Sequence, residues 1–229
     1  MRKWWNLILP AALAVAPASR ALVFTGNVPV DFAVPGVVQI ADAVRDVSMP
    51  AQAPEGQLSG WDLEKVCFKL DTESGDLLVG LDFASLASDA DGDGVEGVSP
   101  LWLAAGGGLD TPKLGPGGSI CVAFDFDRNG RWDVVAGFAL GLESYQVAAF
   151  AGEATRPYQA FGEALPAHLG AAHFTGTAEA PDVEFTLAQA AGLLAADGCF
   201  DFQAFAGSFD DGPIGEDTQS GTTCLAVTQ

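Results

Sequence analysis

Short runs of β-forming residues, separated by clusters of Gly, Pro and Asp, recur along most of the chain. The runs have strand lengths and occupy residues 37–40, 65–70, 77–83, 119–126, 132–139, 146–151, 183–185, 200–206 and 224–228. Such spacing is typical of an all-β sandwich or barrel. We predict an all-β fold, an antiparallel β-sandwich with long Gly/Asp-rich loops.

Two local patterns add detail to this prediction. Residues 71–76 contain Gly75 between two strand runs and predict a hairpin. Residues 187–196 are rich in Ala and Leu and predict one short helix or helical turn, with Thr186 as N-cap and Gln189 at the capping-box position.

Residues 104–118 form a long Gly/Pro-rich segment that could mark a domain boundary. The strand runs on its two sides resemble partners in one sheet. We therefore expect one domain, covering residues 22–229.

The charge is strongly unbalanced, since 30 Asp and Glu face 10 Lys and Arg and the formal net charge is −20. A surface this acidic repels nucleic acid and anionic lipid headgroups but attracts divalent cations. The apolar fraction of 49% excludes an acidic disordered tail. We expect a globular protein with no nucleic-acid partner.

The N-terminus has the pattern of a secretory signal peptide over residues 1–18. Arg2 and Lys3 precede an apolar stretch that ends in the small-residue segment Ala16-Pro17-Ala18, and Ala21 offers a second cleavage point. The stretch is shorter than a membrane span needs. We expect a secreted protein, extracellular or at the cell surface, with no membrane span after cleavage.

Four cysteines in an oxidising compartment favour two disulfides, with three pairings open. Cys67 and Cys121 alternate out of phase with the large apolar residues of their strands, so both should project from the less buried faces and could link neighbouring strands. Cys199 and Cys224 would close the last segment, which contributes ~3 kcal/mol in the chain-entropy description. Buried free thiols are the alternative.

Residues 125–133 form a D-x-D-x-N-G-x-x-D run between two strand patterns. Alternating carboxylate and amide oxygens can converge on one hard cation, and calcium is the natural occupant. The loop resembles the calcium-binding hairpin loops of integrin-type repeats; an acidic turn without an ion is the alternative. The candidate ligands are Asp125, Asp127, Asn129, the carbonyl oxygen of Arg131, and Asp133.

Residues 89–96 repeat the first half of this pattern as D-x-D-x-D-G. Carboxylates so close together repel one another unless a cation or solvent screens them. We expect a second calcium here, with a solvated acidic loop as the alternative. The candidate ligands are Asp89, Asp91, Asp93 and Glu96.

Other polar groups give weaker signals. A third acidic patch, Asp210-Asp211 with Glu216-Asp217, lacks ligand spacing and is expected to be a solvated turn. His168 and His173 match no zinc-protease motif and are expected on the surface. No nucleophile elbow, phosphate loop or dinucleotide fingerprint occurs, so no catalytic residue is assigned.

Two tryptophans lie beside the acidic loops and could offer flat faces for stacking on a ligand. Trp102 follows the second loop and Trp132 lies inside the first. Packing in the core or along its rim is the alternative for both.

Several phrases in one order resemble secreted calcium-loop β-sandwich domains of microbial surface proteins. They are SGWDL followed by VCF, then DLLVGL, SDADGDG, VAFDFD leading to WDVVAG, and AFAGSF before IGED, within residues 25–218. More distantly, the pattern is similar to family 9 carbohydrate-binding modules and DOMON-type domains. That resemblance implies a jelly-roll-like sandwich with structural calcium and sugar binding.

Together these features predict a secreted, calcium-binding β-sandwich module that binds a polysaccharide or cell-surface component without catalysis. A carbohydrate-active enzyme, a glycosidase using paired carboxylates, is one alternative. A structural or adhesive extracellular matrix protein is the other.

Overall fold

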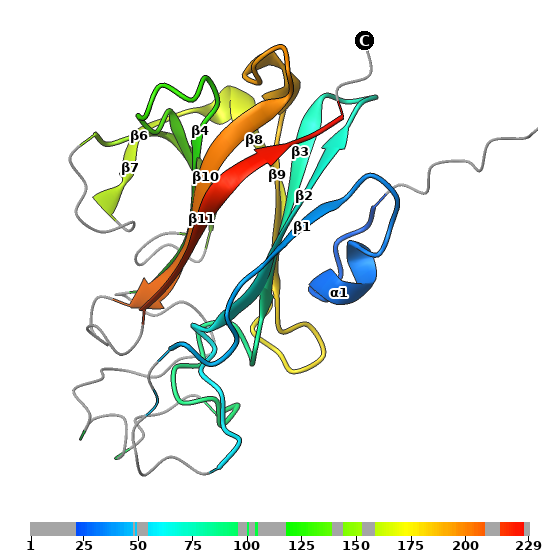
Figure 1. Cartoon of the computed structure of the whole chain (residues 1–229). Coiled ribbons are helices and arrows are strands. Elements are labelled where there is room, and N and C mark those ends of the chain that lie inside the picture. Colours follow the sequence, from blue (N-terminus) through cyan, green and yellow to red (C-terminus); the bar gives the residue numbers. More distant parts are fainter. Residues whose placement is uncertain are drawn as a thin grey trace, which may run out of the picture.

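The computed structural model describes residues 22–47, 49, 55–95, 100, 104, 118–138, 144–152, 159–208 and 216–226. In these residues 11 β-strands form two antiparallel sheets that lie as two layers (Figure 1). The predicted antiparallel β-sandwich is confirmed. The predicted signal peptide, residues 1–18, and the second cleavage point at residue 21 lie outside the described residues.

The first sheet has five strands in the order β1-β2-β3-β9-β8. Its β2 and β3 form the predicted hairpin, with Leu70 opposite Leu77 and Asp71 opposite Asp76. The strands are β1 (Val38–Ala41), β2 (Leu63–Asp71), β3 (Asp76–Phe83), β9 (Val183–Leu187) and β8 (Leu169–His173).

The second sheet has six strands in the order β11-β10-β4-β5-β6-β7. They are β11 (Glu216–Cys224), β10 (Cys199–Ser208), β4 (Gly118–Asp125), β5 (Val134–Phe138), β6 (Tyr145–Phe150) and β7 (Phe161–Ala164). We expected the strands on the two sides of residues 104–118 to share one sheet. That is wrong, because β3 lies in the first sheet and β4 in the second.

Aromatic side chains from both sheets form the centre of the core. Because alternate residues of a strand point to opposite faces, β4 and β10 each send a row of apolar side chains inward. Phe68 of β2 contacts Phe124, Phe200 and Phe202 of the second sheet, with ring centroids 6.2, 5.3 and 4.9 Å apart. All four rings are fully buried, so this contact joins the two layers.

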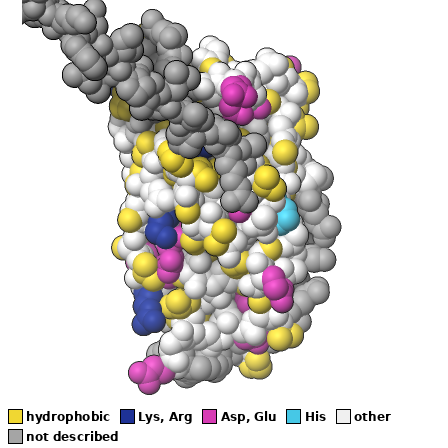
Figure 2. All heavy atoms as spheres, turned by 90° about the vertical axis from the view of Figure 1, so that its right-hand side faces the viewer, with side chains coloured by type: hydrophobic (Ala, Val, Ile, Leu, Met, Phe, Trp, Pro, Cys, Tyr) yellow, Lys and Arg dark blue, Asp and Glu magenta, His cyan; other side chains and the backbone are white. Residues whose placement is uncertain are grey.

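A short helix, α1 (Val28–Asp31), covers part of the outer face of the first sheet (Figure 1). Asn27 caps it by accepting a hydrogen bond from the Val30 N–H, and Phe32 packs beside Cys67. Figure 2 shows this side of the molecule, where acidic side chains are scattered and Lys and Arg are few. In the described part of the chain, no helix combines the length and the apolar character that crossing a bilayer requires.

The structure corrects one part of the cysteine prediction. Cys199 and Cys224 form a disulfide between β10 and β11, but Cys67 and Cys121 are free and buried. Both do point away from the central core, as their phase predicted. However, they lie on the outer faces of different sheets, Cys67 under α1 and Cys121 beside Phe205, so they cannot meet.

Three edge strands differ from the sequence prediction. The structure has β7 and β8, which were not predicted, and β11 ends at Cys224 where a strand over 224–228 was expected. All three lie at sheet edges and are largely exposed or polar, so they lack the apolar alternation by which strands are recognised.

The predicted helix over 187–196 is reduced to a single 3₁₀ turn, η3 (Ala190–Gly192). Strand β9 continues through Thr186, which therefore cannot be the N-cap. Gln189 occupies the cap position in a left-handed conformation, with φ of 54° and no side-chain cap, and its N–H donates to Asp76 Oδ1 at 2.8 Å.

The cysteine arrangement predicts the reactivity of the thiols. In the non-reduced protein unfolded in guanidinium chloride, a thiol reagent should detect two thiols per chain. The folded protein should react far more slowly, because burial raises the pKa of Cys67 and Cys121 to about 12. Detection of no thiol in the unfolded protein would mean that two disulfides form.

Candidate metal sites

The segment between β4 and β5 folds into a tight loop from Asp125 to Asp133. One carboxylate oxygen from each of Asp125, Asp127 and Asp133 lies within 4.8 Å of the other two. Asp125 is buried, whereas Asp127 and Asp133 are exposed. The three acidic ligands expected for this loop therefore lie together.

Hydrogen bonds from the backbone hold these side chains in place. Asp125 accepts from Asn129 N at 3.1 Å and from Gly130 N at 2.7 Å. Asp127 Oδ1 accepts from Asn129 N at 3.1 Å, and Asn129 Oδ1 accepts from Arg131 N at 2.9 Å. Such bonds from a side chain to the backbone a few residues later curve the chain around the oxygens.

The segment after β3 forms a second loop of the same kind. Oxygens of Asp89, Asp91 and Asp93 lie within 4.8 Å of one another. Asp89 accepts from Gly92 N at 2.9 Å and from Gly94 N at 2.6 Å, and it is fully buried. Burial raises the pKa of Asp89, while the N–H groups of Gly94 and Gly92 oppose that rise.

The two loops share one hydrogen-bond pattern when their residues are numbered from the first Asp. Position 1 accepts from the N–H of position 6, at 2.6 Å in residues 89–94 and 2.7 Å in residues 125–130. The side chain of position 3 accepts from the N–H of position 5, at 3.2 Å in the first of these loops and 3.1 Å in the second. The side chain of position 5 accepts from the N–H of position 7, at 2.7 Å and 2.9 Å respectively. Positions 4 and 6 have positive φ in both loops. Two segments with different neighbours therefore adopt the same oxygen-rich turn.

Both loops are anchored in the molecule through their second residue. Ala90 and Phe126 occupy this position and belong to the central core. The 89–94 loop also packs directly on the chain before β2. A Cβ at Gly92 would lie 1.9 Å from the carbonyl oxygen of Leu58, and Gly92 has a φ of +70°, so no other residue fits this turn.

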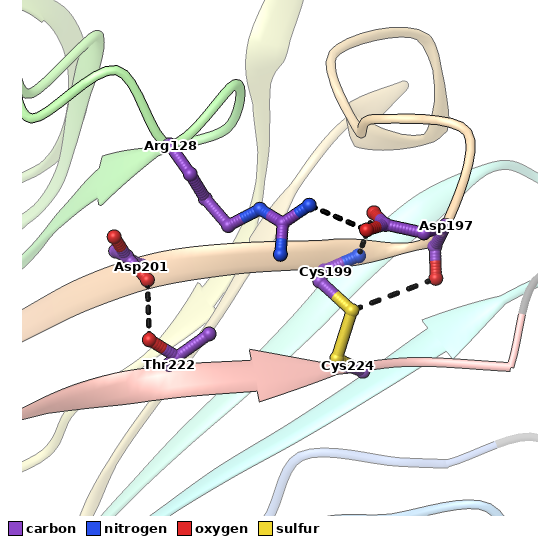
Figure 3. Close-up of polar contacts among 6 residues, drawn as sticks. All are labelled: Arg128, Asp197, Cys199, Asp201, Thr222 and Cys224. Carbon is purple, nitrogen blue, oxygen red and sulfur yellow. Dashed lines mark hydrogen bonds and ion pairs between the residues drawn. A yellow bond between two sulfur atoms is a disulfide. The ribbon is translucent and has the colours of Figure 1, made fainter.

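The 125–133 loop is connected to the disulfide end of the second sheet (Figure 3). Arg128, at the fourth position of the loop, forms an ion pair with Asp197. The Asp197 carboxylate also accepts from Cys199 N at 3.0 Å, and these two contacts hold its pKa below the ordinary value. Asp197 thus links the loop to the start of β10.

The remaining candidates for the two loops are placed differently. The Asn129 side chain is part of the turn, with Nδ2 donating to Asp127 Oδ2 at 2.9 Å, and Arg131 is exposed. Trp132 is half-buried, with its ring tilted against Phe150 at a centroid distance of 6.4 Å. Glu96 and Trp102 lie outside the described residues.

A third acidic group was not foreseen from the sequence. Oxygens of Asp46, Asp62 and Asp217 lie within 4.8 Å of one another. Asp217 was expected in a solvated turn with Glu216; instead it lies near the start of β11 with 7% of its surface exposed. The other pair of that patch, residues 210–211, lies outside the described residues. The three carboxylates come from distant segments, so no spacing in the sequence could reveal the group.

A cavity of about 400 Å³ adjoins the 89–94 loop. The loop supplies part of its wall, and the rest comes mainly from small residues after β3 and before β9. Its lining includes Phe83, Ala84, Ser85, Asp89, Asp93, Thr177, Ala178 and Pro181. A cation in the loop would therefore lie beside a space open to a ligand.

Two further buried carboxylates bind backbone N–H groups of the N-terminal segment and belong to none of the three acidic groups found among the described residues. Asp182 accepts from Phe83 N at 3.1 Å and from Val28 N at 2.9 Å, and Glu184 Oε2 accepts from Gly26 N at 2.6 Å. Burial raises the pKa of Asp182 to about 7 and that of Glu184 to about 8. Glu184 attaches a residue before α1 to the first sheet and Asp182 attaches the first residue of α1, which is a structural role.

The two histidines, which were expected on the surface, are each partly exposed. Both are half-buried, and His168 Nδ1 lies 2.9 Å from the carbonyl oxygen of Ala188. His173 lies opposite Glu184 in the register of β8 and β9. The three acidic groups found among the described residues contain only Asp, so histidine belongs to none of them.

Comparison with known proteins finds no matching family model, no matching curated protein and no matching solved structure. No relative therefore supplies a function, and only the geometry and the sequence patterns of this chain bear on it.

The environment of Glu184 predicts a pH-dependent stability. Its ordinary pKa is 4.5 and its folded pKa about 8, so between these values the folded state keeps a proton that the unfolded state has lost. Raising the pH across this window therefore favours unfolding. Glu184→Gln stays neutral and can still accept from Gly26, so it should be more stable than wild type by about 1–3 kcal/mol at pH 9 and similar at pH 5.

Urea unfolding at a series of pH values measures this difference. Glu163→Gln makes the same chemical change at an exposed position of β7 and should leave the pH dependence unaltered. A Glu184→Gln protein that is equally stable at pH 5 and no more stable than wild type at pH 9 would contradict the assignment.

Proposed function

We propose that this protein is a secreted calcium-binding β-sandwich module that binds a polysaccharide or cell-surface component without catalysis. The observation that carries the proposal is the shared turn of residues 89–94 and 125–130. Each belongs to a group of three Asp carboxylates with oxygens within 4.8 Å of one another, Asp133 being the third member in the second loop, and both turns have positive φ at the same two positions.

The chemistry of the donors favours calcium over other cations. All side-chain donors in the two turns are carboxylate or amide oxygens, which hard cations prefer, while zinc and copper favour nitrogen and sulfur. Hydrogen bonds from backbone N–H groups leave further lone pairs on each carboxylate oxygen for a cation. One calcium in each loop would also offset the repulsion between its three acidic groups.

The cavity beside Asp89 and Asp93 supports a role in ligand binding. A calcium ion held by these residues would face a space of about 400 Å³, where it could coordinate hydroxyl oxygens of a sugar. Trp132 offers a partly exposed ring at the other loop. The resemblance to calcium-loop sandwich domains and to family 9 carbohydrate-binding modules supports the same class of ligand.

Secretion is supported by the N-terminal sequence pattern and by the Cys199–Cys224 disulfide, because disulfides persist in oxidising compartments. A non-catalytic role is supported by the structural contacts of two of the three carboxylates whose pKa burial raises to about 7 or 8. Asp182 and Glu184 hold backbone N–H groups of the N-terminal segment.

Calcium binding is expected to stabilise the protein. At a free concentration of 100 times Kd, each ion should add about 2.7 kcal/mol to the free energy of unfolding, and EDTA should remove this gain. Asp93→Ala and Asp127→Ala should each remove one ion from the calorimetric stoichiometry, and the double variant should lose two.

Glu73→Gln is the control for these variants, because it neutralises an exposed carboxylate in the β2–β3 turn, away from the acidic groups. Its calcium stoichiometry should equal that of wild type. The proposal fails if calcium gives wild type no heat of binding and no rise in melting temperature.

Retention on polysaccharides separates the module from its alternatives. We expect calcium-dependent retention, without turnover in a chromogenic glycoside screen. Ala178→Trp should abolish retention by filling the cavity, whereas Ala171→Trp, exposed on β8, should leave it intact. Turnover that one carboxylate substitution abolishes would indicate a glycosidase; a calcium-loaded protein without retention would favour an adhesive or structural role.

A further inference from the structure

The third acidic group lies where the two sheets meet at one edge of the sandwich. Asp46 follows β1, Asp62 directly precedes β2, and Asp217 is the second residue of β11. Strands β1 and β2 belong to the first sheet and β11 to the second. The group therefore joins side chains of different layers.

Direct polar contacts already cross this edge. Asp217 Oδ2 accepts a hydrogen bond from Leu63 N at 2.7 Å, and Gln219 Nε2 donates to the carbonyl oxygen of Ala41 at 2.8 Å. Asp217 Oδ1 accepts from Thr218 N of its own strand at 2.6 Å. These contacts fix Asp217 beside the start of β2.

Asp62 is the most deeply buried member of the group, with 1% of its surface exposed. Its Oδ2 accepts from Arg45 N at 2.8 Å. Its Oδ1 is shielded from solvent, and no group in the described part of the chain donates a hydrogen bond to it. The same holds for Asp42 Oδ2 at the end of β1. Buried carboxylate oxygens without a partner are rare, and a bound ion is one of the arrangements that satisfies them.

The charges around these oxygens are of one sign. Burial is the main cause that raises the pKa of Asp62 to about 6 and the pKa of Asp217 to about 7. The negative charges of Asp42 and Asp46 raise both pKa values further, and the charge of Glu64 also raises that of Asp62. A buried group of this kind needs a proton or a cation.

We propose that Asp46, Asp62 and Asp217 bind a calcium ion that links the two sheets. Calcium–oxygen distances are about 2.3–2.6 Å, so two oxygens bound to the same ion lie within ~5 Å of each other. The oxygens of this group lie within 4.8 Å of one another, which agrees with that geometry. Asp62 Oδ1 is the oxygen best prepared to coordinate it. The negative charge of Asp42 adds to the attraction for a cation, and the all-oxygen donor set again favours calcium over zinc.

This ion would act differently from those of the two loops. A loop calcium stabilises a local turn, whereas an ion here would hold β11 against the start of β2. Its removal should loosen the Leu63 and Thr218 N–H groups, which donate to Asp217, and leave the 89–94 and 125–133 loops unchanged.

Equilibrium dialysis with calcium tests the site in the Asp93→Ala/Asp127→Ala protein, in which both loops are disabled. This protein should retain one ion per chain. Adding Asp46→Asn should weaken the affinity for that ion roughly 10–100-fold. Asp46 is exposed, so its substitution should not disturb folding, whereas Asp62→Asn could; Glu73→Gln is the control and should not change the affinity.

The outcomes separate this site from the loop sites. Loss of every ion in the folded loop-disabled protein would overturn the third site while leaving the loop proposal intact. A single wild-type ion that depends on Asp46 and not on Asp93 or Asp127 would support the third site and refute the loops. Hydrogen exchange at Leu63 and Thr218 that is the same with calcium and with EDTA would contradict the link between the sheets.

Discussion

Carboxylates inside the sandwich that accept hydrogen bonds from backbone N–H groups determine how its loops are arranged. Eight acidic residues of the described chain are buried, and only Asp82 forms an ion pair there, with Lys65 at 2.7 Å. The others are Asp62, Asp89, Asp91, Asp125, Asp182, Glu184 and Asp217. Because cations are scarce, backbone N–H groups provide most of the compensation for their burial.

This constraint divides the acidic residues into two kinds. Asp182 and Glu184 attach the N-terminal segment to the first sheet, and burial raises their pKa values enough for a proton to satisfy them. The three Asp groups instead bring several oxygens within 4.8 Å of one another. There, repulsion between neighbouring carboxylates favours a divalent cation. The net charge of −20 is thus partly concentrated in positions suited to calcium.

The features that were predictable from the sequence are those written in contiguous residues. The strands of the core could be predicted because their apolar residues alternate, and both loops could be predicted because a D-x-D-x-[DN]-G run sets its own geometry. The free state of Cys67 and Cys121 could not, because it depends on which sheet each strand joins. The edge strand β11 is polar and lacks apolar alternation, so it was not predicted from the sequence. The burial of Asp217, which lies in this strand, was therefore not predicted either. A group assembled from Asp46, Asp62 and Asp217 exists only after the two sheets have packed.

A crystal structure of the protein grown with calcium, with an anomalous difference map, tests the central claim most directly. The account predicts peaks between the carboxylates of Asp89, Asp91 and Asp93, between those of Asp125, Asp127 and Asp133, and between those of Asp46, Asp62 and Asp217. A well-ordered map at millimolar calcium without a peak at any of the three groups would contradict it.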